Sequence, residues 1–230
     1  GLADPGPVMR IFDLPMFRKR LRLEGVVTVV DAPHLEQSLN EVAACLEQIT
    51  YADMLILNKV DRVSDAELER CKARLAELNP LAGLQLARFS RVAVDSVLRL
   101  RQQGSSSLDS KQTAESHHHH HHDEDIRPVV LEFEGEVNVR ELDLWLGGLA
   151  RRDDMTLLRM KGVLAVPGDH RRFVFNGVRS ALDVWPDRAW GDEARVSRIV
   201  MIGRSLKSHD LREGFHSCAL PNQVMEASAD

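Results

Sequence analysis

Three polar residues at the end of a short apolar run have the chemistry to recognise a ligand. Residues 54–57 read Met-Leu-Ile-Leu and are followed by Asn58, Lys59, Val60 and Asp61. A short continuous apolar run suits a strand buried on both faces, as in a parallel sheet. Ligands of open α/β sheets bind beyond the carboxyl ends of the strands. We therefore expect Asn58, Lys59 and Asp61 to project toward a ligand.

The chemistry of these side chains fits a guanine base. An Asp carboxylate accepts two hydrogen bonds side by side, and guanine offers such a pair through its ring N–H and its exocyclic amino group. Adenine lacks the pair, so a site built around Asp61 should reject adenine by roughly 10⁴-fold. Lys59 can lay its aliphatic stem along the base, and the Asn58 amide can tie neighbouring loops together. The four residues match the N-K-x-D pattern of GTP-binding proteins.

An alternative remains open for this stretch. Four-residue motifs also occur by chance, so their structural context has to confirm them. In the alternative, the strand is followed by an ordinary polar turn, and Asp61 caps the next helix.

Composition excludes several classes of protein. The chain has 230 residues, which allow one large or two modest domains. A net charge of −5 gives no reason to expect a nucleic-acid partner. No apolar run is long enough to span a bilayer, and the opening Gly-Leu-Ala-Asp-Pro is not a signal peptide. Because the first residue is not Met, we expect a fragment or a processed piece.

The three cysteines point to a reducing compartment. Cys45, Cys71 and Cys218 are odd in number and have no C-x-x-C spacing. This pattern argues against a disulfide framework and against a thiolate metal site made within the chain. We expect a cytoplasmic protein, with the nucleus as a second compartment.

The first hundred residues alternate helices and strands. Asp4 is a good N-cap and Pro5 suits a first turn, so a short helix follows, with a bend at Pro15. Ser64 and Glu67 have the spacing of a capping box. The pattern predicts a strand at residues 25–32, a helix at 34–49, the strand at 54–57, a helix at 65–78, a strand at 84–89 and a helix at 92–100. This order implies a parallel sheet with crossover helices.

Residues 102–127 change in composition and are expected to form a flexible linker. Within it lies a run of six histidines: His117, His118, His119, His120, His121 and His122. Imidazole ligands suit zinc and similar divalent ions. An expression tag has the same sequence, although tags usually lie at a terminus. From the run alone, a metal-binding segment and an inserted tag or inert linker both stay open.

The sequence after the linker predicts a small, largely antiparallel α+β domain. Strands are expected at residues 128–133, 157–166, 171–176, 182–185 and 198–203, and helices after Asn138 and at 208–215. Gly162 is expected to form a β-bulge, and Gly168 to lie in a hairpin turn. A solvated basic face is expected on this sheet from Arg159, Lys161, Arg171, Arg172 and Arg179.

Several segments, in matching order along nearly the whole chain, resemble the CobW-type GTPases of the metallochaperone class. Besides Asn-Lys-Val-Asp, they are Gly-Leu-Ala-Asp-Pro at 1–5, Gly-Val-Val-Thr-Val-Val-Asp-Ala at 25–32, Leu-Asn-Pro-Leu-Ala at 78–82, Arg-Met-Lys-Gly at 159–162 and Arg-Ile-Val-Met-Ile-Gly-Arg at 198–204. The histidine run falls where many members carry a His-rich segment. Within the family, the chain looks most like the eukaryotic zinc-regulated GTPase metalloprotein activators.

The resemblance implies an α/β fold in two domains. Residues 1–101 would form part of a P-loop NTPase domain, a parallel sheet with crossover helices. Residues 102–127 would form the His-rich linker, and residues 128–216 a small α+β CobW-type C-terminal domain. A disordered tail would follow at 217–230.

The resemblance also implies cofactors and partners. GTP or GDP with Mg²⁺ would bind the first domain, where Asn58, Lys59 and Asp61 would read guanine and Gly1 would approach the γ-phosphate through its backbone N–H. The histidine segment would hold or relay zinc or a related divalent ion. The recipient would be a client metalloprotein, such as a metallo-aminopeptidase. Neither a nucleic acid nor a membrane is expected as a partner.

Parts of the family pattern are missing from these 230 residues. There is no G-x-x-x-x-G-K-[ST], whose backbone cradles phosphates, and no C-x-C-C metal motif. Because phosphoryl transfer depends on such parts, we expect no useful GTP hydrolysis by this chain alone and take the complete protein to be the GTPase. The alternative is a non-catalytic metal-binding or client-docking module that has lost its nucleotide function.

Overall fold

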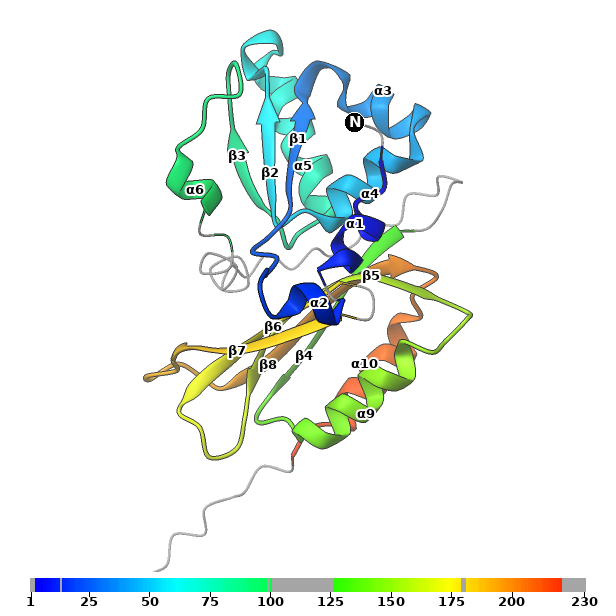
Figure 1. The fold of residues 1–230 in the computed structure, drawn as a ribbon, viewed down its shortest axis with the longest axis vertical. Coiled ribbons are helices and arrows are strands. Elements are labelled where there is room, and N and C mark those ends of the chain that lie inside the picture. Colours follow the sequence, from blue (N-terminus) through cyan, green and yellow to red (C-terminus); the bar gives the residue numbers. More distant parts are fainter. Residues whose placement is uncertain (1–2, 13, 99, 101–125, 179–180, 221–230) are drawn as a thin grey trace, which may run out of the picture.

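The chain forms two units, one above the other in Figure 1, each built around its own sheet. This computed structural model describes residues 3–12, 14–98, 100, 126–178 and 181–220. Gly1, the six histidines and Arg179 lie outside the described residues.

The first unit is a parallel α/β sheet, as the sequence predicted. Its elements are, in chain order, α1 (Pro5–Ile11), α2 (Pro15–Arg18), β1 (Val27–Asp31), η1 (Ala32–His34), α3 (Leu35–Glu41), α4 (Ala43–Tyr51), β2 (Met54–Asn58), η2 (Val60–Arg62), α5 (Asp65–Leu78), β3 (Gly83–Leu86) and α6 (Val94–Leu98). The strand order is β1-β2-β3, and both pairings are parallel. The carboxyl ends of all three strands therefore meet at one edge.

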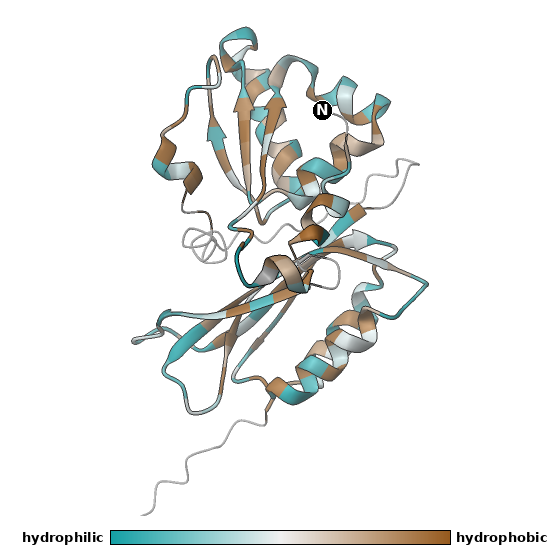
Figure 2. Ribbon diagram, in the orientation of Figure 1, coloured by the Kyte–Doolittle hydropathy of each residue, from teal (hydrophilic) through white to brown (hydrophobic). Residues whose placement is uncertain are grey.

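Strand β2 is the centre of this unit, and all five of its residues are buried. Leu55 and Leu57 belong to a hydrophobic cluster with Leu75 of helix α5. Met54 and Ile56 belong to a second cluster on the other face of the sheet. Figure 2 shows the hydrophobic character of this central strand. Burial on both faces explains why its sequence is a continuous apolar run.

Several element boundaries differ from the sequence prediction, and two of the differences are explained by backbone conformation. The single helix expected at residues 34–49 is broken at Val42, which has extended dihedrals of φ −135° and ψ 101°. Its apolar spacing continues across the break, so the pattern alone could not reveal it. Strand β3 ends at Leu86 rather than at residue 89, because Phe89 and Ser90 have positive φ and cannot continue a strand.

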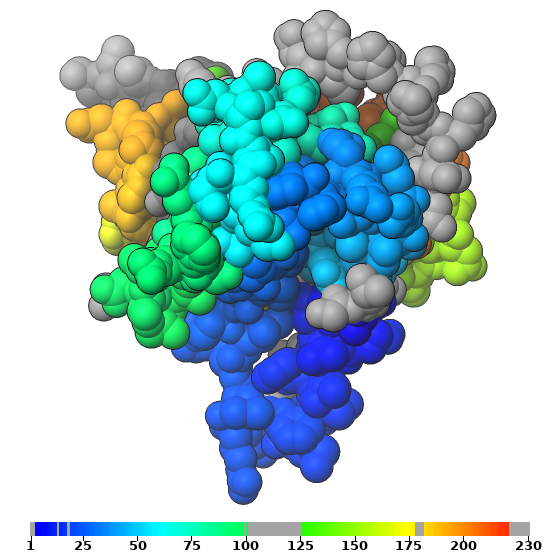
Figure 3. Space-filling model, turned by 90° about the horizontal axis from the view of Figure 1, so that it is seen from above, coloured from blue at the N-terminus to red at the C-terminus, as the bar shows by residue number. Residues whose placement is uncertain are grey.

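Helices α1 and α2 form an N-terminal segment close to both units (Figure 1). Asp4 caps α1 by accepting a hydrogen bond from the Gly6 N–H at 2.7 Å, as predicted. Met9 packs in a cluster with Tyr51 of α4 and Leu158 of the second unit. Seen from above, part of this segment stands out from the rest of the molecule (Figure 3).

The second unit is an antiparallel sheet with two helices, which confirms the α+β prediction. Its elements are β4 (Ile126–Glu134), α9 (Val139–Leu149), β5 (Thr156–Ala165), β6 (Arg171–Val178), β7 (Ala181–Ala189), β8 (Val196–Arg204) and α10 (Ser208–His216). The strand order is β4-β8-β5-β6-β7. Leu142 of α9 and Phe215 of α10 pack with strand residues in the largest core cluster. Trp190 lies on the other face, in a cluster that also includes Leu81 of the first unit.

The bulge predicted at Gly162 is in the wrong place. Gly162 pairs regularly with Phe175 and with Ile199, and the register shift lies between Leu157 and Arg159. A Cβ at position 162 would lie 2.0 Å from Cε1 of Phe175. Glycine is therefore needed here because the Phe175 ring packs against the backbone, not because the strand bulges.

The predicted solvated basic face is also wrong for three of its members. Arg159, Lys161 and Arg172 are only 1%, 4% and 2% exposed. Arg172 pairs with Asp187 at 2.6 Å, and the other two reach the first unit. Each buried cation has a carboxylate partner from a different strand or unit, which a pattern within one strand cannot show.

The chain stays ordered beyond the predicted start of the tail at residue 217. Cys218 is buried, and its carbonyl accepts a hydrogen bond from the Asn138 N–H at 2.8 Å. Ala219 forms a β-bridge with Val137. This return to the start of α9 fixes residues 217–220, while residues 221–230 lie outside the described residues.

Candidate functional site

The carboxyl edge of the parallel sheet brings together the residues singled out from the sequence. Asp31 at the end of β1 is the register partner of Asn58 at the end of β2. Ala87, just after β3, donates its N–H to the Leu57 carbonyl at 2.9 Å, so the loop that follows begins at the same edge. This is the edge at which ligands of parallel α/β sheets bind.

Asn58 ties two loops together, the role expected from its amide. Its Nδ2 donates to Oγ of Ser90 at 2.9 Å, and its Oδ1 accepts from the Ser90 N–H at 2.9 Å. The residue is 8% exposed, so both ends of the amide are satisfied inside the protein. Two hydrogen bonds to one residue fix the position of the loop after β3 relative to β2.

Lys59 has a backbone conformation that is unfavourable for a residue with a side chain. Its φ is 60°, in the left-handed region, which costs roughly 1–2 kcal/mol for residues other than glycine. Its Nζ donates to Oδ2 of Asp31 at 2.6 Å. This ion pair holds the lysine stem beside the edge of the sheet while 41% of the side chain stays exposed.

Asp31, at the end of the strand predicted for residues 25–32, is therefore also a residue of this site, although no sequence pattern assigned it a role. Burial by itself raises the pKa of the Asp31 carboxyl, but hydrogen bonds from Lys59 and His34 outweigh burial and lower that pKa below its ordinary value. The carboxylate stays charged and can orient Lys59. Only the pairing of β1 with β2 shows this partnership, because the two residues are 28 positions apart.

Asp61 lies in the short helix η2 and is exposed. Among the residues that the structure describes, no side chain or backbone group pairs with its carboxylate. The next helix is capped instead by Ser64, whose Oγ accepts from the Glu67 N–H at 3.4 Å while Glu67 accepts from the Ser64 N–H at 2.8 Å. Asp61 therefore does not cap α5, and its two oxygens are available to a ligand.

The loop at residues 88–91 adds a feature that the sequence did not reveal. Phe89 and Ser90 both have positive φ, 52° and 54°. Two consecutive left-handed residues other than glycine turn the chain sharply, and Phe89, which directly precedes Ser90, is 79% exposed. Such outliers often mark functional loops, but no sequence pattern predicts them.

Metal-binding residues are not assembled within the described part of the chain. No group of three or more His, Cys, Asp or Glu side chains in the described ranges is placed to hold an ion. The three cysteines are free, and burial raises the pKa of the Cys71 and Cys218 thiols. The predicted metal segment, His117 to His122, and Gly1 lie outside the described residues.

None of the described helices has the length and apolar character needed to cross a bilayer.

The hydrogen-bonding groups of the site fit the base of a guanine nucleotide. An exposed, unpartnered carboxylate can accept the two N–H groups of guanine, and an anchored lysine stem lies two positions before it. Residues that would hold phosphates or Mg²⁺ are not among those brought to this edge.

Comparisons with known proteins agree with the order of these two units. Residues 1–85 match the family described as CobW/HypB/UreG, nucleotide-binding domain. Residues 126–219 match the cobalamin synthesis protein cobW C-terminal domain. Both matches agree with the resemblance to CobW-type GTPases found in the sequence.

Curated relatives cover nearly the whole chain. The zinc chaperone YjiA of Escherichia coli is 30% identical over 94% of this chain and 67% of its own length. The zinc chaperone CobW of Pseudomonas aeruginosa is 32% identical over 100% of this chain and 65% of its own length. The zinc-regulated GTPase metalloprotein activator 1 of Schizosaccharomyces pombe is 30% identical over 46% of this chain and 27% of its own length. The chain thus spans about two thirds of the length of the two bacterial relatives.

A solved structure supports the fold independently. The crystal structure of the Zn(II)-bound YjiA GTPase from E. coli superposes with a TM-score of 0.74 at 28% identity, covering 96% of this chain and 69% of that one. Both domains match in order, and a relative is 30% identical over 94% of this chain and 67% of its own length. This chain belongs to the CobW family, with a CobW/HypB/UreG nucleotide-binding domain followed by a CobW C-terminal domain.

Proposed function

We propose that this protein is a GTP-dependent metal chaperone that delivers zinc, or a related divalent ion, to a client metalloprotein. The observation that carries the proposal is the arrangement of Asn58, Lys59 and Asp61 at the carboxyl end of β2. Relatives that are named zinc chaperones, one of them solved as a Zn(II)-bound GTPase, support the metal part.

Asp61 would read the base. Its two oxygens would accept the ring N–H and the exocyclic amino group of guanine, a pair that adenine does not offer. Adenine would leave the carboxylate without donors, so selectivity should come mainly from this residue. The Lys59 stem, held by Asp31 at 2.6 Å, would lie along the face of the base.

The loop at residues 88–91 would contact the base from the other side. Asn58 holds this loop through Ser90, and the exposed Phe89 directly precedes Ser90. An aromatic ring at that place would add stacking area. The two hydrogen bonds between Asn58 and Ser90 would keep this loop, the second wall of the base site, at a fixed distance from β2.

Phosphates and Mg²⁺ would bind beyond these residues. When bound, Mg²⁺ would neutralise charge on the phosphate oxygens. Gly1 would approach the γ-phosphate through its backbone N–H, by the resemblance to the family.

The metal cargo would be held by the histidine segment, His117 to His122, whose imidazoles suit zinc. We assign the recipient to the class of metalloproteins, with a metallo-aminopeptidase as the finer proposal. Delivery would take place in the cytoplasm, or also in the nucleus.

Binding of GDP and ADP to the chain tests the proposal. Isothermal titration should show GDP binding more tightly than ADP, and Asp61→Ala should remove that preference without unfolding the protein. Asp95→Ala, which changes an exposed carboxylate on α6, is the matched control and should keep the preference.

Equal affinity for GDP and ADP in the unaltered chain would contradict guanine recognition. If zinc still bound to such a chain in equilibrium dialysis, the protein would instead be a non-catalytic metal-binding module.

A further inference from the structure

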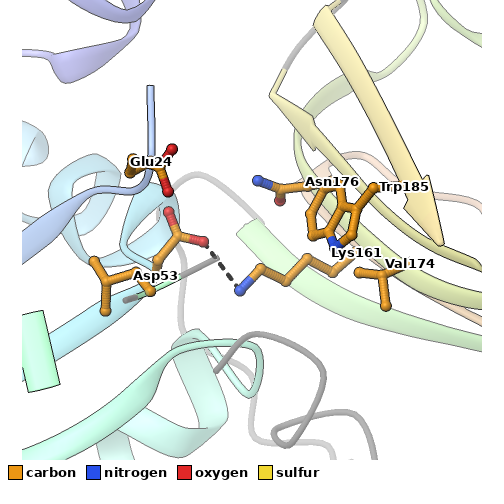
Figure 4. Close-up of a pocket in the computed structure, with 7 residues that line it drawn as sticks. Glu24, Asp53, Lys161, Val174, Asn176 and Trp185 are labelled. Atoms are coloured by element: carbon orange, nitrogen blue, oxygen red, sulfur yellow. Dashed lines mark ion pairs between the residues drawn. The ribbon is translucent and has the colours of Figure 1, made fainter. Parts of the chain in front are cut away.

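The two domains meet at the amino end of the parallel sheet, opposite the base site. Asp53 immediately precedes β2 and lies at the centre of this contact (Figure 4). Its Oδ2 accepts a hydrogen bond from the Val26 N–H at 2.9 Å, which fixes the carboxylate relative to the first domain. The cations that surround it come from β5 of the second domain.

One carboxylate serves two cations. Oδ1 of Asp53 pairs with Nη2 of Arg159 and lies 3.0 Å from Nζ of Lys161. The three side chains are 7%, 1% and 5% exposed. Lys161 also lies 3.4 Å from the Leu81 carbonyl of the first domain, which accepts its hydrogen bond. All of these contacts require the two domains to be together.

The charge state of the cluster follows from its surroundings. Burial by itself raises the pKa of the Asp53 carboxyl, but the charges of Arg159 and Lys161 and the hydrogen bonds outweigh burial and lower that pKa below its ordinary value. Burial lowers the pKa of Lys161, and Asp53 opposes that change. The carboxylate is therefore the charged centre on which the cluster depends.

A β-bulge directs β5 toward this contact. The register shift between Leu157 and Arg159 inserts Leu158 as an extra residue. As a result, Leu158 packs against Tyr51 while the next residue, Arg159, reaches Asp53. Two consecutive side chains of one strand thus contact the same neighbouring domain, which a regular strand does not allow.

A small cavity beside the cluster is lined by polar groups from both domains. It has a volume of about 10 Å³, and its lining includes Glu24, Asp53, Lys161 and Asn176 (Figure 4). Oδ1 of Asn176 is buried without a partner among the described residues. A space of this size fits one water molecule, which would donate to Asn176 and accept from Lys161.

Buried charges make the relative orientation of the domains specific. A buried cation that loses its carboxylate is left uncompensated, so a rotation that separates these groups is unfavourable. A second ion pair, Glu47 with Arg204 at 3.1 Å, joins α4 to β8 at the same contact, with side chains 16% and 31% exposed. The Asp53 cluster is the more deeply buried of the two.

We propose that Asp53 is the positioning residue that fixes the C-terminal domain relative to the nucleotide-binding domain. It holds two cations of β5 from the amino end of the strand whose carboxyl end bears Asn58. The strand is five residues long and fully buried, so the base site and the contact between domains share one rigid element. This assignment concerns the described residues only and does not depend on which nucleotide binds.

Asp53→Asn tests the assignment because it keeps the shape of the side chain and removes its charge. In the full chain, small-angle scattering should give a larger radius of gyration for this variant, and calorimetry should resolve two unfolding transitions in place of one. Glu132→Gln is the control: Glu132 pairs with Arg198 within the C-terminal domain, and its loss should change neither measurement.

Two further variants sharpen the test. Lys161→Met leaves one cation for one carboxylate and should keep the single transition. The double variant Arg159→Met with Lys161→Met removes both cations and should separate the domains as Asp53→Asn does, also if Asp53→Asn itself fails to fold. An unchanged radius and a single transition in the double variant would overturn the proposal. Neither measurement uses a nucleotide, so failure of guanine recognition would leave this result intact.

Discussion

The carboxyl edge and the amino edge of the parallel sheet each carry an ion pair between an Asp and a Lys, one exposed and the other buried. At the carboxyl edge, Asp31 pairs with Lys59 at 2.6 Å, and the side chains are 35% and 41% exposed. At the amino edge, Asp53 pairs with Lys161 at 3.0 Å, and the side chains are 7% and 5% exposed. The two pairs have similar lengths, so burial is the main difference between them. The exposed pair holds the Lys59 side chain at the carboxyl edge of the sheet, and the buried pair joins two domains.

Removing each carboxylate should reveal the largest difference between the edges. Asp53→Ala leaves two buried cations without a carboxylate partner and should lower the free energy of unfolding by about 3–5 kcal/mol. Asp31→Ala breaks an exposed pair and should cost less than about 1 kcal/mol. Urea denaturation of both variants beside the unaltered chain measures the two values. Equal losses would mean that burial does not separate the two pairs.

Acid should release the domains while each is still folded. The pKa of Asp53 is lowered in the folded state, so the stability it supplies is complete above its ordinary pKa of 3.8 and is lost as the pH falls through the lower folded value. Scattering along a pH titration should therefore show the radius increasing only below that ordinary value.

Asp31→Ala provides the control for this titration. Its pKa is also lowered, but it lies away from the contact between the domains, so the variant should separate at the same pH as the unaltered chain. Separation at a pH well above 4 would show that a group other than Asp53 holds the contact.

Loss of the Asn58 amide should have a smaller and more local effect. Asn58→Ala removes both hydrogen bonds to Ser90 and should cost roughly 1–3 kcal/mol. The Ser90 amide should then exchange its hydrogen faster, and GDP should bind more weakly. Ser96→Ala, which removes a 2.8 Å hydrogen bond to Gln85, is the control and should leave the Ser90 amide protected. Unchanged exchange at Ser90 would mean that the loop holds its shape without the tie.

The sequence predicted those parts of the fold that depend on residues close together in the chain. The apolar run of β2, the capping box at Ser64 and the N-cap at Asp4 are all local signals, and all three were confirmed. The parallel order of the strands followed from the alternation of helices and strands. The predicted position of Asn58 and Lys59 was correct, because a motif that ends a strand of a parallel sheet must lie at the carboxyl edge of that sheet.

The contact between the domains could not be predicted in this way. Asp53 and Arg159 are 106 positions apart. In the sequence, Asp53 looks like an ordinary charged residue before a strand, and Arg159 like one within a strand. Arg159, Lys161 and Arg172 were assigned to solvent because a charge is usually exposed unless a distant partner is known. The bulge was assigned to Gly162 because glycine is common at bulges, whereas the structure uses glycine there for the Phe175 ring.

The bulge in β5 also bears on which sequence changes the protein can tolerate. Leu157 packs in the core beneath the helices, whereas Leu158 packs between the domains. Leu157 and Arg159 pair with consecutive residues of β8, so deleting Leu158 would restore a regular strand with Leu157 still opposite Gly203 and still in the core. The deletion would remove only the side chain that packs with Tyr51. A deletion at a regularly paired position of β5 would instead move every residue before it to the other face of the sheet. We therefore expect a change in chain length to be better tolerated at Leu158 than elsewhere in the strand.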